Sequence, residues 1–171
     1  MKLTRITAFS FMLLGMGLFI SCEKQKQFES SDKPYIHEKS DIALTGAQVI
    51  PASTSPATGT LWVSYNEKNR LLNYELSWGG LRDTIREINI YEAPIGYTTI
   101  VPAVQKLPAF NASNLRANQT TYPFAGGKYV GAAVIDNVVF AKEKLLNHRY
   151  YIQIHTKQFP NGEVRAQIKF K

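Results

Sequence analysis

The chain has 171 residues, a formal net charge of +7, 44% hydrophobic residues and a single cysteine. This composition excludes a disulfide-stapled scaffold and a disordered chain, and the length is sufficient for one domain with its own core. The basic residues form no block of five or more and accompany no reading element, so we expect no nucleic-acid partner.

The start of the chain is typical of a bacterial export signal. Lys2 and Arg5 precede an apolar stretch at residues 6–20, and a small residue stands directly before the lone Cys22. A membrane-spanning helix is one alternative, but it needs about 20 apolar residues, which is more than this stretch supplies. A secretory signal cleaved elsewhere is the other alternative, but it leaves an exported cysteine without a partner.

The segment Phe19-Ile20-Ser21-Cys22 resembles a bacterial lipobox, in which the cysteine thiol is acylated and becomes the new N-terminus. The resemblance implies a lipoprotein signal peptide over residues 1–21 and lipidation of Cys22. Several acyl chains anchor a protein stably, whereas one chain binds only marginally. We therefore expect an exported protein that is lipid-anchored to a bacterial membrane, the outer membrane or cell surface rather than the inner membrane.

Residues 22–40 are expected to form a flexible tether, because they are charged, polar and poor in large apolar side chains. A folded domain is expected over residues 41–171. Its period-two alternation recurs in short segments separated by turn signals, which predicts strands. The strands are expected at 42–49, 59–65, 71–78, 85–91, 98–104, 128–135, 149–156 and 163–170, and one short helix at 141–146.

These segments predict an all-β fold, an antiparallel Greek-key or immunoglobulin-like sandwich of about seven or eight strands with one short helix. The pair Asn161-Gly162 is a strong signal for a turn between the last two strands. The irregular stretch 94–124 is mostly loop, and loops of this length often bind ligands. Its aromatic residues either supply a binding surface or fold back onto the core: Tyr97, Phe110, Tyr122 and Phe124.

The last two strands are expected to bring His155 near Glu163 and Arg165 on their polar face. One interpretation is an exposed group of cross-strand polar contacts. The other is a ligand or metal site, although one His and one Glu are few ligands for zinc or copper. The sequence has neither G-x-S-x-G nor H-E-x-x-H, so we expect no catalytic residue, no enzyme activity, no metal and no cofactor.

Two segments of the domain carry motifs of a known family. The first is Leu44-Thr45-Gly46-Ala47-Gln48-Val49-Ile50-Pro51, followed by Ser55-Pro56-Ala57-Thr58-Gly59. The second is Tyr150-Tyr151-Ile152-Gln153-Ile154-His155-Thr156, followed by Pro160-Asn161-Gly162-Glu163-Val164-Arg165-Ala166-Gln167-Ile168. They are similar to the family patterns L-x-G-x-Q-E-V-P, S-x-A-x-G, Y-x-x-I-H-T and P-x-G-E-I-R-G-Q-L. The domain therefore resembles the CHRD domain, a module named from chordin and common in bacterial exported proteins, over residues 42–169.

One departure from the family pattern concerns the candidate site. The family usually has a His-x-His pair on a middle strand, where this chain has Asn89 and Tyr91. Residues at i and i+2 share one face of a strand, so the resemblance places both in a polar cluster with His155, Glu163 and Arg165. Asn and Tyr are poor replacements for His as ligands of borderline metals. This departure favours a hydrogen-bonded cluster over a three-histidine metal site.

We expect a membrane-anchored CHRD-domain lipoprotein of the cell envelope that acts as a non-enzymatic binding or interaction module. Its expected partners are the membrane, through the lipid anchor, and an envelope protein or polysaccharide. The alternative is a metal-binding protein or metalloenzyme that uses the polar strand face around His155. A purely structural envelope protein is a third alternative.

Overall fold

The computed structural model describes residues 35–107 and 126–170. The all-β prediction is confirmed, because the described residues form antiparallel strands and one short α-helix. The first strand of the described residues starts at Ile36, within the segment that the sequence predicts to be a tether. The elements in chain order are β1 (Ile36–Thr45), η1 (Gly46–Gln48), β2 (Thr58–Asn66), β3 (Leu71–Gly79), β4 (Ile85–Glu92), β5 (Ala103–Lys106), β6 (Gly126–Val134), α1 (Lys142–Leu146), β7 (Tyr150–Thr156) and β8 (Val164–Gln167).

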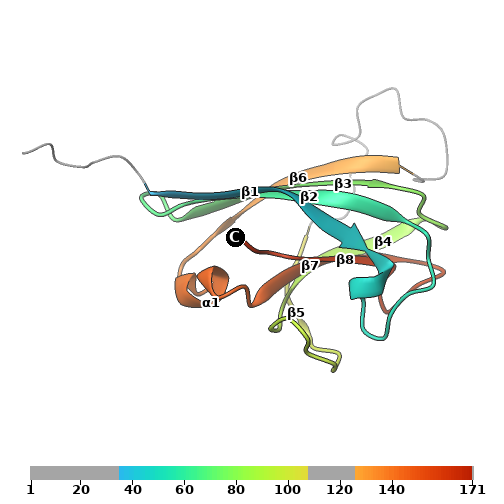
Figure 1. Ribbon diagram of the computed structural model, residues 1–171. Helices are drawn as coiled ribbons and strands as arrows, with labels where there is room; N and C mark the ends of the chain where they lie inside the picture. The colour runs from blue at the N-terminus through green and yellow to red at the C-terminus, as the bar shows by residue number, and fades with distance from the viewer. Residues whose placement is uncertain (1–34, 108–125, 171) are drawn as a thin grey trace, which may run out of the picture. The chain divides into compact units, whose positions relative to one another are not determined.

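The strands form two layers that face each other (Figure 1). The upper layer has the strand order β1-β2-β3-β6, and the lower layer has the order β5-β4-β7-β8. One bridge between Thr45 of β1 and Arg165 of β8 joins the two layers. The described strands therefore form one continuous hydrogen-bonded sheet that curls over itself, rather than the two separate sheets of an immunoglobulin-like sandwich.

The upper layer follows the alternation that its sequence predicts. In β3, every second side chain is buried, and the residues between them are only partly buried. β2 and β3 pair along their full length around a turn in which Asn66 Oδ1 accepts a hydrogen bond from the backbone N–H of Lys68. The inward side chains of the upper layer contribute to the main core: Leu44, Leu61, Val63, Tyr65, Leu72, Tyr74, Leu76 and Trp78.

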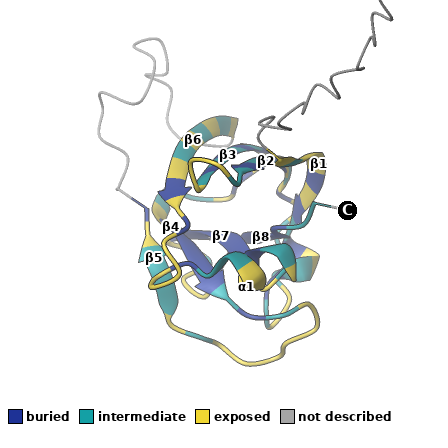
Figure 2. Ribbon diagram, turned by 90° about the vertical axis from the view of Figure 1, so that its left-hand side faces the viewer, coloured by how far each residue is buried: buried dark blue, intermediate teal, exposed yellow. Residues whose placement is uncertain are grey.

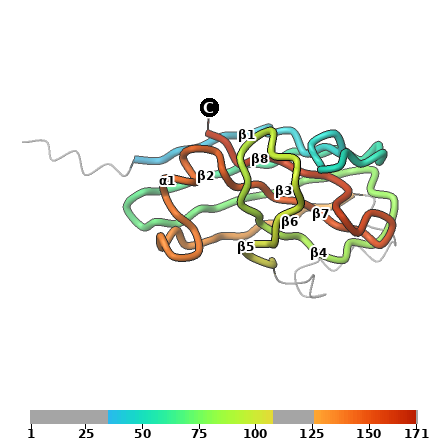
Figure 3. The backbone as a smooth tube through the Cα atoms, turned by 90° about the horizontal axis from the view of Figure 1, so that it is seen from below, coloured from blue at the N-terminus to red at the C-terminus, as the bar shows by residue number. Residues whose placement is uncertain are grey.

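The lower layer departs from that alternation. β7 and β8 are buried at every position, although Ile152 and Ile154 face the core and their neighbours face outward. Figure 2 shows the two strands as continuously buried. The outward face of these strands is covered by residues 93–103, which we call the covering segment and which lies across the lower layer in Figure 3.

The short helix lies where the sequence predicts it. α1 buries Leu145 against the core, and the hydroxyl of Tyr150 accepts a hydrogen bond from the backbone N–H of Ala141, just before the helix. This contact connects α1 to the start of β7. Among the helices of the described residues, none has the length and apolar character needed to cross a membrane.

Candidate functional site

The outward face of the lower layer holds polar side chains that are almost completely buried. Asn89 is 2% exposed, His155 9% and Arg165 4%. The outer face of an antiparallel sheet is commonly solvated, so burial of polar groups here needs a cover and hydrogen-bond partners. The covering segment supplies the cover, because Val101 and Ala103 pack against a small second core made by Tyr91, Ala93 and Tyr151.

A chain of hydrogen bonds runs across β4 and β7. Asn89 Nδ2 donates to Tyr91 Oη at 3.2 Å, and Tyr91 Oη lies 2.7 Å from His155 Nε2. His155 Nδ1 lies 2.9 Å from the carbonyl oxygen of Pro160. Gln153 Nε2 donates to the carbonyl oxygen of Asn161 at 2.8 Å. The network therefore connects two strands to the turn that precedes β8.

The partners of His155 determine its tautomer. The Pro160 carbonyl can only accept, so Nδ1 carries the proton and Nε2 accepts the hydrogen bond from the Tyr91 hydroxyl. Burial lowers the pKa of His155 below its ordinary value, although the Pro160 carbonyl and the charge of Glu87 oppose this shift. Burial also raises the pKa of Tyr91. Both groups are therefore neutral at pH 7, with Tyr91 as donor and His155 as acceptor.

Asn89 forms the other end of this chain of hydrogen bonds. Its Nδ2 atom also donates to Glu87 Oε2 at 2.8 Å, which fixes the orientation of the amide. This hydrogen bond is the main reason why the pKa of Glu87 is lowered. The Oδ1 atom of Asn89 is buried and has no hydrogen-bond partner among the described residues. Asn89 thus leaves one unused acceptor next to the network.

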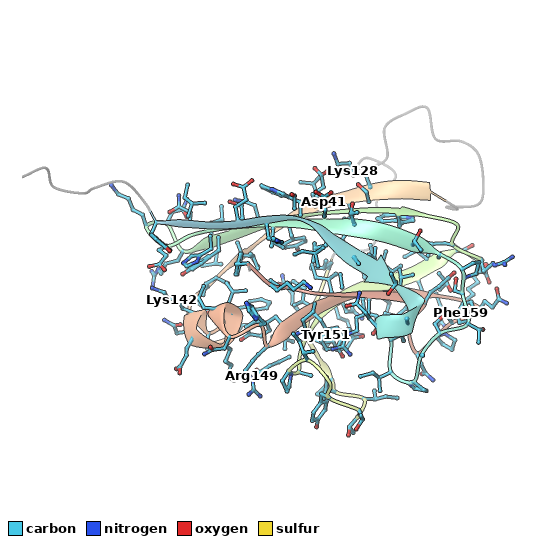
Figure 4. The ribbon with its side chains drawn as sticks, viewed as in Figure 1. Asp41, Lys128, Lys142, Arg149, Tyr151 and Phe159 are labelled. Atoms are coloured by element: carbon cyan, nitrogen blue, oxygen red, sulfur yellow. The ribbon has the colours of Figure 1, made fainter. Side chains whose placement is uncertain are left out.

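Arg165 lies against an aromatic ring rather than against a carboxylate. Its guanidinium carbon is 3.5 Å from the centroid of the Tyr151 ring, and its Nη2 donates to Gln167 Oε1 at 2.9 Å. Figure 4 labels Tyr151 on the lower layer. Gln167 is held in turn, because its Nε2 donates to three backbone carbonyl oxygens, those of Ala93, His148 and Tyr150. The ring and Gln167 together fix the plane of the guanidinium.

Several of these side chains line a pocket of about 230 Å³. Its polar wall contains His155, Gln153, Arg165 and parts of the turn at residues 160–161, whereas Arg86 and Glu87 contribute charged groups from β4. The remaining lining residues are aromatic, aliphatic or small: Ile50, Tyr91, Thr99, Ile100, Val101 and Tyr151. The pocket therefore combines a fixed set of polar groups with an apolar wall, as small-molecule sites commonly do.

The turn before β8 shapes one side of this pocket. Gly162 has a φ of +120°, which side chains rarely tolerate, and a Cβ atom at this position would collide with the side-chain amide of Gln153. Glycine therefore lets the turn approach β7 closely enough for the carbonyls of Pro160 and Asn161 to accept hydrogen bonds from His155 and Gln153. The Asn-Gly signal in the sequence marks this turn correctly.

Glu163 lies elsewhere, which corrects the expectation that it joins His155. Its carboxylate accepts hydrogen bonds from Thr156 Oγ1 at 2.6 Å, Ser55 Oγ at 2.6 Å and the backbone N–H of Arg82 at 2.8 Å. β8 begins only at Val164, so the alternation of the strand does not extend to Glu163. Glu163 is completely buried and connects β7 to two loops, and it is not among the residues that line the pocket.

The structure brings together four of the five residues that the sequence analysis placed in the cluster. Asn89, Tyr91 and His155 form the hydrogen-bonded chain, and Arg165 lies in the same pocket as Tyr91 and His155. The roles of Tyr151 and Gln153 were not predicted from the sequence. The signal for Tyr151 is a large aromatic residue at an outward strand position, which needs a cover. Cys22 and the aromatic residues Phe110, Tyr122 and Phe124 lie outside the described residues, and Tyr97 is partly exposed.

The hydrogen bonds of His155 limit what its ring can bind. Both ring nitrogens of His155 are within hydrogen-bond distance of protein atoms, so metal ligation would require His155 to give up Tyr91 or Pro160. Within residues 35–107 and 126–170, no group of three or more His, Cys, Asp or Glu side chains is placed to hold a metal ion. The groups that line the pocket include two guanidinium groups, one carboxylate, amides, a neutral imidazole and aromatic rings.

The fold and the pocket define an all-β domain in which one curled sheet forms two layers, with a covered polar face on one of them. The model of the CHRD domain matches residues 41–168, and the chain belongs to this family. This finding confirms the resemblance that the sequence motifs indicate. No curated protein and no solved structure matches the chain.

Proposed function

We propose that this protein is an extracytoplasmic binding module that is held on a bacterial membrane by lipid at Cys22 and contacts its ligand through the pocket of the lower layer. Membership of the CHRD family supports a binding role outside the cell. The observation that carries the proposal is the covered pocket, because the fold buries a polar strand face and still leaves about 230 Å³ beside it.

The proposed role is non-enzymatic. A nucleophile or general base needs a free lone pair and a pKa suited to its task. The pKa of Tyr91 is raised by burial, and His155 Nε2 already accepts the hydrogen bond from Tyr91. The pocket therefore favours holding a ligand in place, either a free small molecule or a group on an envelope protein or polysaccharide.

The proposed function can be tested by capture from native membranes. The full-length protein is compared with Thr99→Trp, which places a bulky ring at an exposed position of the pocket lining, and with Asn73→Trp on the outer side of the upper layer as a matched control. We expect wild type and Asn73→Trp to enrich the same envelope component and Thr99→Trp to lose it at equal thermal stability. Equal enrichment by all three proteins, or no enrichment by any, would contradict the proposal.

The lipid anchor needs a separate test. Cys22→Ser removes the thiol that the lipobox resemblance assigns to acylation. We expect this variant to leave the membrane fraction, because it loses the acyl chains that anchor the protein. Mass spectrometry of the N-terminal peptide of wild type should show cleavage before residue 22 and added fatty acid mass. An unmodified thiol in the native host refutes the anchor and leaves the pocket unaffected.

A further inference from the structure

Arg165 is a buried cation that has no carboxylate partner in the part of the chain that the structure describes. The residue is 4% exposed. Its guanidinium takes part in none of the ion pairs found among the described residues. Its hydrogen-bond acceptor is the neutral amide of Gln167. Burial of a charge costs free energy unless the charge is paired, so buried arginines are usually paired with carboxylates. The absence of such a partner needs an explanation.

Burial also lowers the pKa of Arg165, and the phenol group of Tyr151 opposes this shift through its charge. The guanidinium nevertheless stays charged, because arginine is not deprotonated in proteins. The free protein therefore keeps a positive charge that forms no ion pair with a carboxylate of residues 35–107 or 126–170. This arrangement is typical of a site whose counter-charge arrives with the ligand.

The guanidinium of Arg165 is held in an orientation that suits a negatively charged ligand. Guanidinium presents five N–H donors in a planar fork, which matches the two oxygens of a carboxylate. The Tyr151 ring covers one face of this plane, and Gln167 takes a donor at one edge. The hydrogen bond to Gln167 uses one of the five donors, and Arg165 is one of the residues that line the pocket. Because the plane is fixed before binding, little rotamer entropy is lost when a ligand arrives.

The other charges of the pocket also favour an anion. Arg86 adds a second positive group to the lining. Glu87 is the negative group there, but its carboxylate accepts a hydrogen bond from Asn89 and lies 3.8 Å from Lys106 Nζ. His155 contributes no charge at pH 7, because burial lowers its pKa. The two arginines therefore outweigh the one carboxylate.

The size of the pocket and its apolar wall limit the rest of the ligand. A cavity of about 150 Å³ accommodates benzene, and this pocket has about 230 Å³. Ile50, Ile100 and Val101 supply the apolar wall. We propose that the pocket binds a small carboxylate-bearing ligand, with the carboxylate on Arg165 and a ring or short chain against the aliphatic wall. This inference rests on the proposed function, which makes the pocket a binding site.

The same carboxylate chemistry occurs in free small acids and in the acidic sugars of polysaccharides. Benzoate and glucuronate represent these two sources as probes, and benzamide and glucuronamide are their neutral counterparts. Binding to the purified protein is followed by amide chemical shifts in NMR at constant ionic strength. We expect saturable binding of at least one carboxylate and an affinity at least tenfold weaker for its amide, since a charged hydrogen bond at a buried site is lost. The preferred carboxylate identifies the source.

Substitutions at Arg165 test its part in the site. Arg165→Gln removes the charge, and Arg165→Lys keeps the charge but lacks the fork. We expect a loss of binding of more than tenfold in Arg165→Gln and an intermediate loss in Arg165→Lys. Arg149→Gln removes a half-exposed arginine that lies 3.8 Å from Glu92 and outside the pocket, and it should bind as wild type does. Circular dichroism and thermal midpoints check that each variant is folded.

Three results would overturn the inference. They are equal affinity for a carboxylate and its amide, unchanged binding in folded Arg165→Gln, and no saturable binding of either carboxylate up to about 10 mM, where even weak sites are detected. The failure of this inference is distinguishable from failure of the proposed function. If Thr99→Trp still loses the envelope component, the pocket remains a binding site for a neutral ligand. If Thr99→Trp keeps that component, the proposed function itself fails.

Discussion

The two layers of this domain have different outer faces. On the upper layer, the outward side chains of β3 are partly exposed, and the inward ones are buried, as alternation predicts. On the lower layer, β7 is buried at all of its positions, because the covering segment packs against its outward side. Only the outer face of the lower layer is both polar and covered by another segment of the chain. The comparison indicates that a site in such a fold is found where a strand stops alternating between buried and exposed.

Of the substitutions that test this difference between the faces, we expect Tyr151→Ala to lower the stability of the protein most. Tyr151→Ala removes a buried ring that contacts Tyr91, the covering segment and the Arg165 guanidinium. We expect the free energy of unfolding to fall by about 3 kcal/mol, as for other large buried side chains. Asn73→Ala, at an outward position of the upper layer, should change it by less than about 0.5 kcal/mol. Urea denaturation measures both values, and equal losses would show that the two faces do not differ.

Substitution of Glu163 tests how much its carboxylate contributes to stability by connecting β7 to two loops. Glu163→Ala leaves the hydroxyls of Ser55 and Thr156 and the backbone N–H of Arg82 without their acceptor. Because buried donors without partners are costly, we expect a loss of about 2 kcal/mol. Glu143→Ala on the exposed side of α1 serves as the control and should stay near the wild-type value. A wild-type midpoint for Glu163→Ala in urea denaturation would show that the carboxylate does not stabilise the fold.

The pH dependence of stability should distinguish the covered face from the exposed one. Burial depresses the pKa of His155 in the folded protein, whereas the unfolded chain has the ordinary value of about 6.5. The unfolded state therefore binds more protons below about pH 6.5, and stability falls as pH decreases from there toward the folded pKa. The groups that face the ring are Tyr91, Glu87, Gln153 and the Pro160 carbonyl.

Replacement of the ring tests this pH dependence. His155→Gln should flatten the fall in stability between pH 6.5 and lower pH, as measured by thermal midpoints across a pH series. His148→Asn removes a histidine outside the network and provides the control, since Asn tolerates the positive φ of 56° at this position. An unchanged pH profile in His155→Gln would assign the effect to other groups.

Among the predicted losses of stability, we expect a small one for removal of an exposed ion pair on the upper layer. Lys128 Nζ lies 2.7 Å from Glu75 Oε1, but the lysine side chain is 57% exposed. Exposed ion pairs contribute little because water and salt screen them, so Lys128→Ala should cost less than about 1 kcal/mol. The effect should shrink further in high salt, which denaturation at two salt concentrations checks. A loss as large as that of Tyr151→Ala would remove the distinction between the two faces.

The sequence predicted most of the strands, because apolar side chains recur at every second position along them. The strand expected at 98–104 was largely wrong, since it overlaps β5 only at Ala103 and Val104. The sequence predicted the polar cluster from the motif around His155 and from the turn at Asn161-Gly162, and both positions are local in the chain. It did not predict that the covering segment packs on the lower layer, since this contact joins residues that are far apart in the sequence. It misplaced Glu163, because the register of β8 starts one residue later. The pocket depends on these two non-local features.

The bridge between Thr45 and Arg165 has a practical consequence for protein engineering. At position 165 the main chain joins the layers, whereas the side chain lies in the pocket. Backbone hydrogen bonds do not depend on the side chain that the residue carries. A library randomised at position 165 and at exposed pocket positions such as Thr99 should therefore yield folded variants with altered ligand preference. The domain is in this respect a scaffold that can be retargeted without redesign of its architecture.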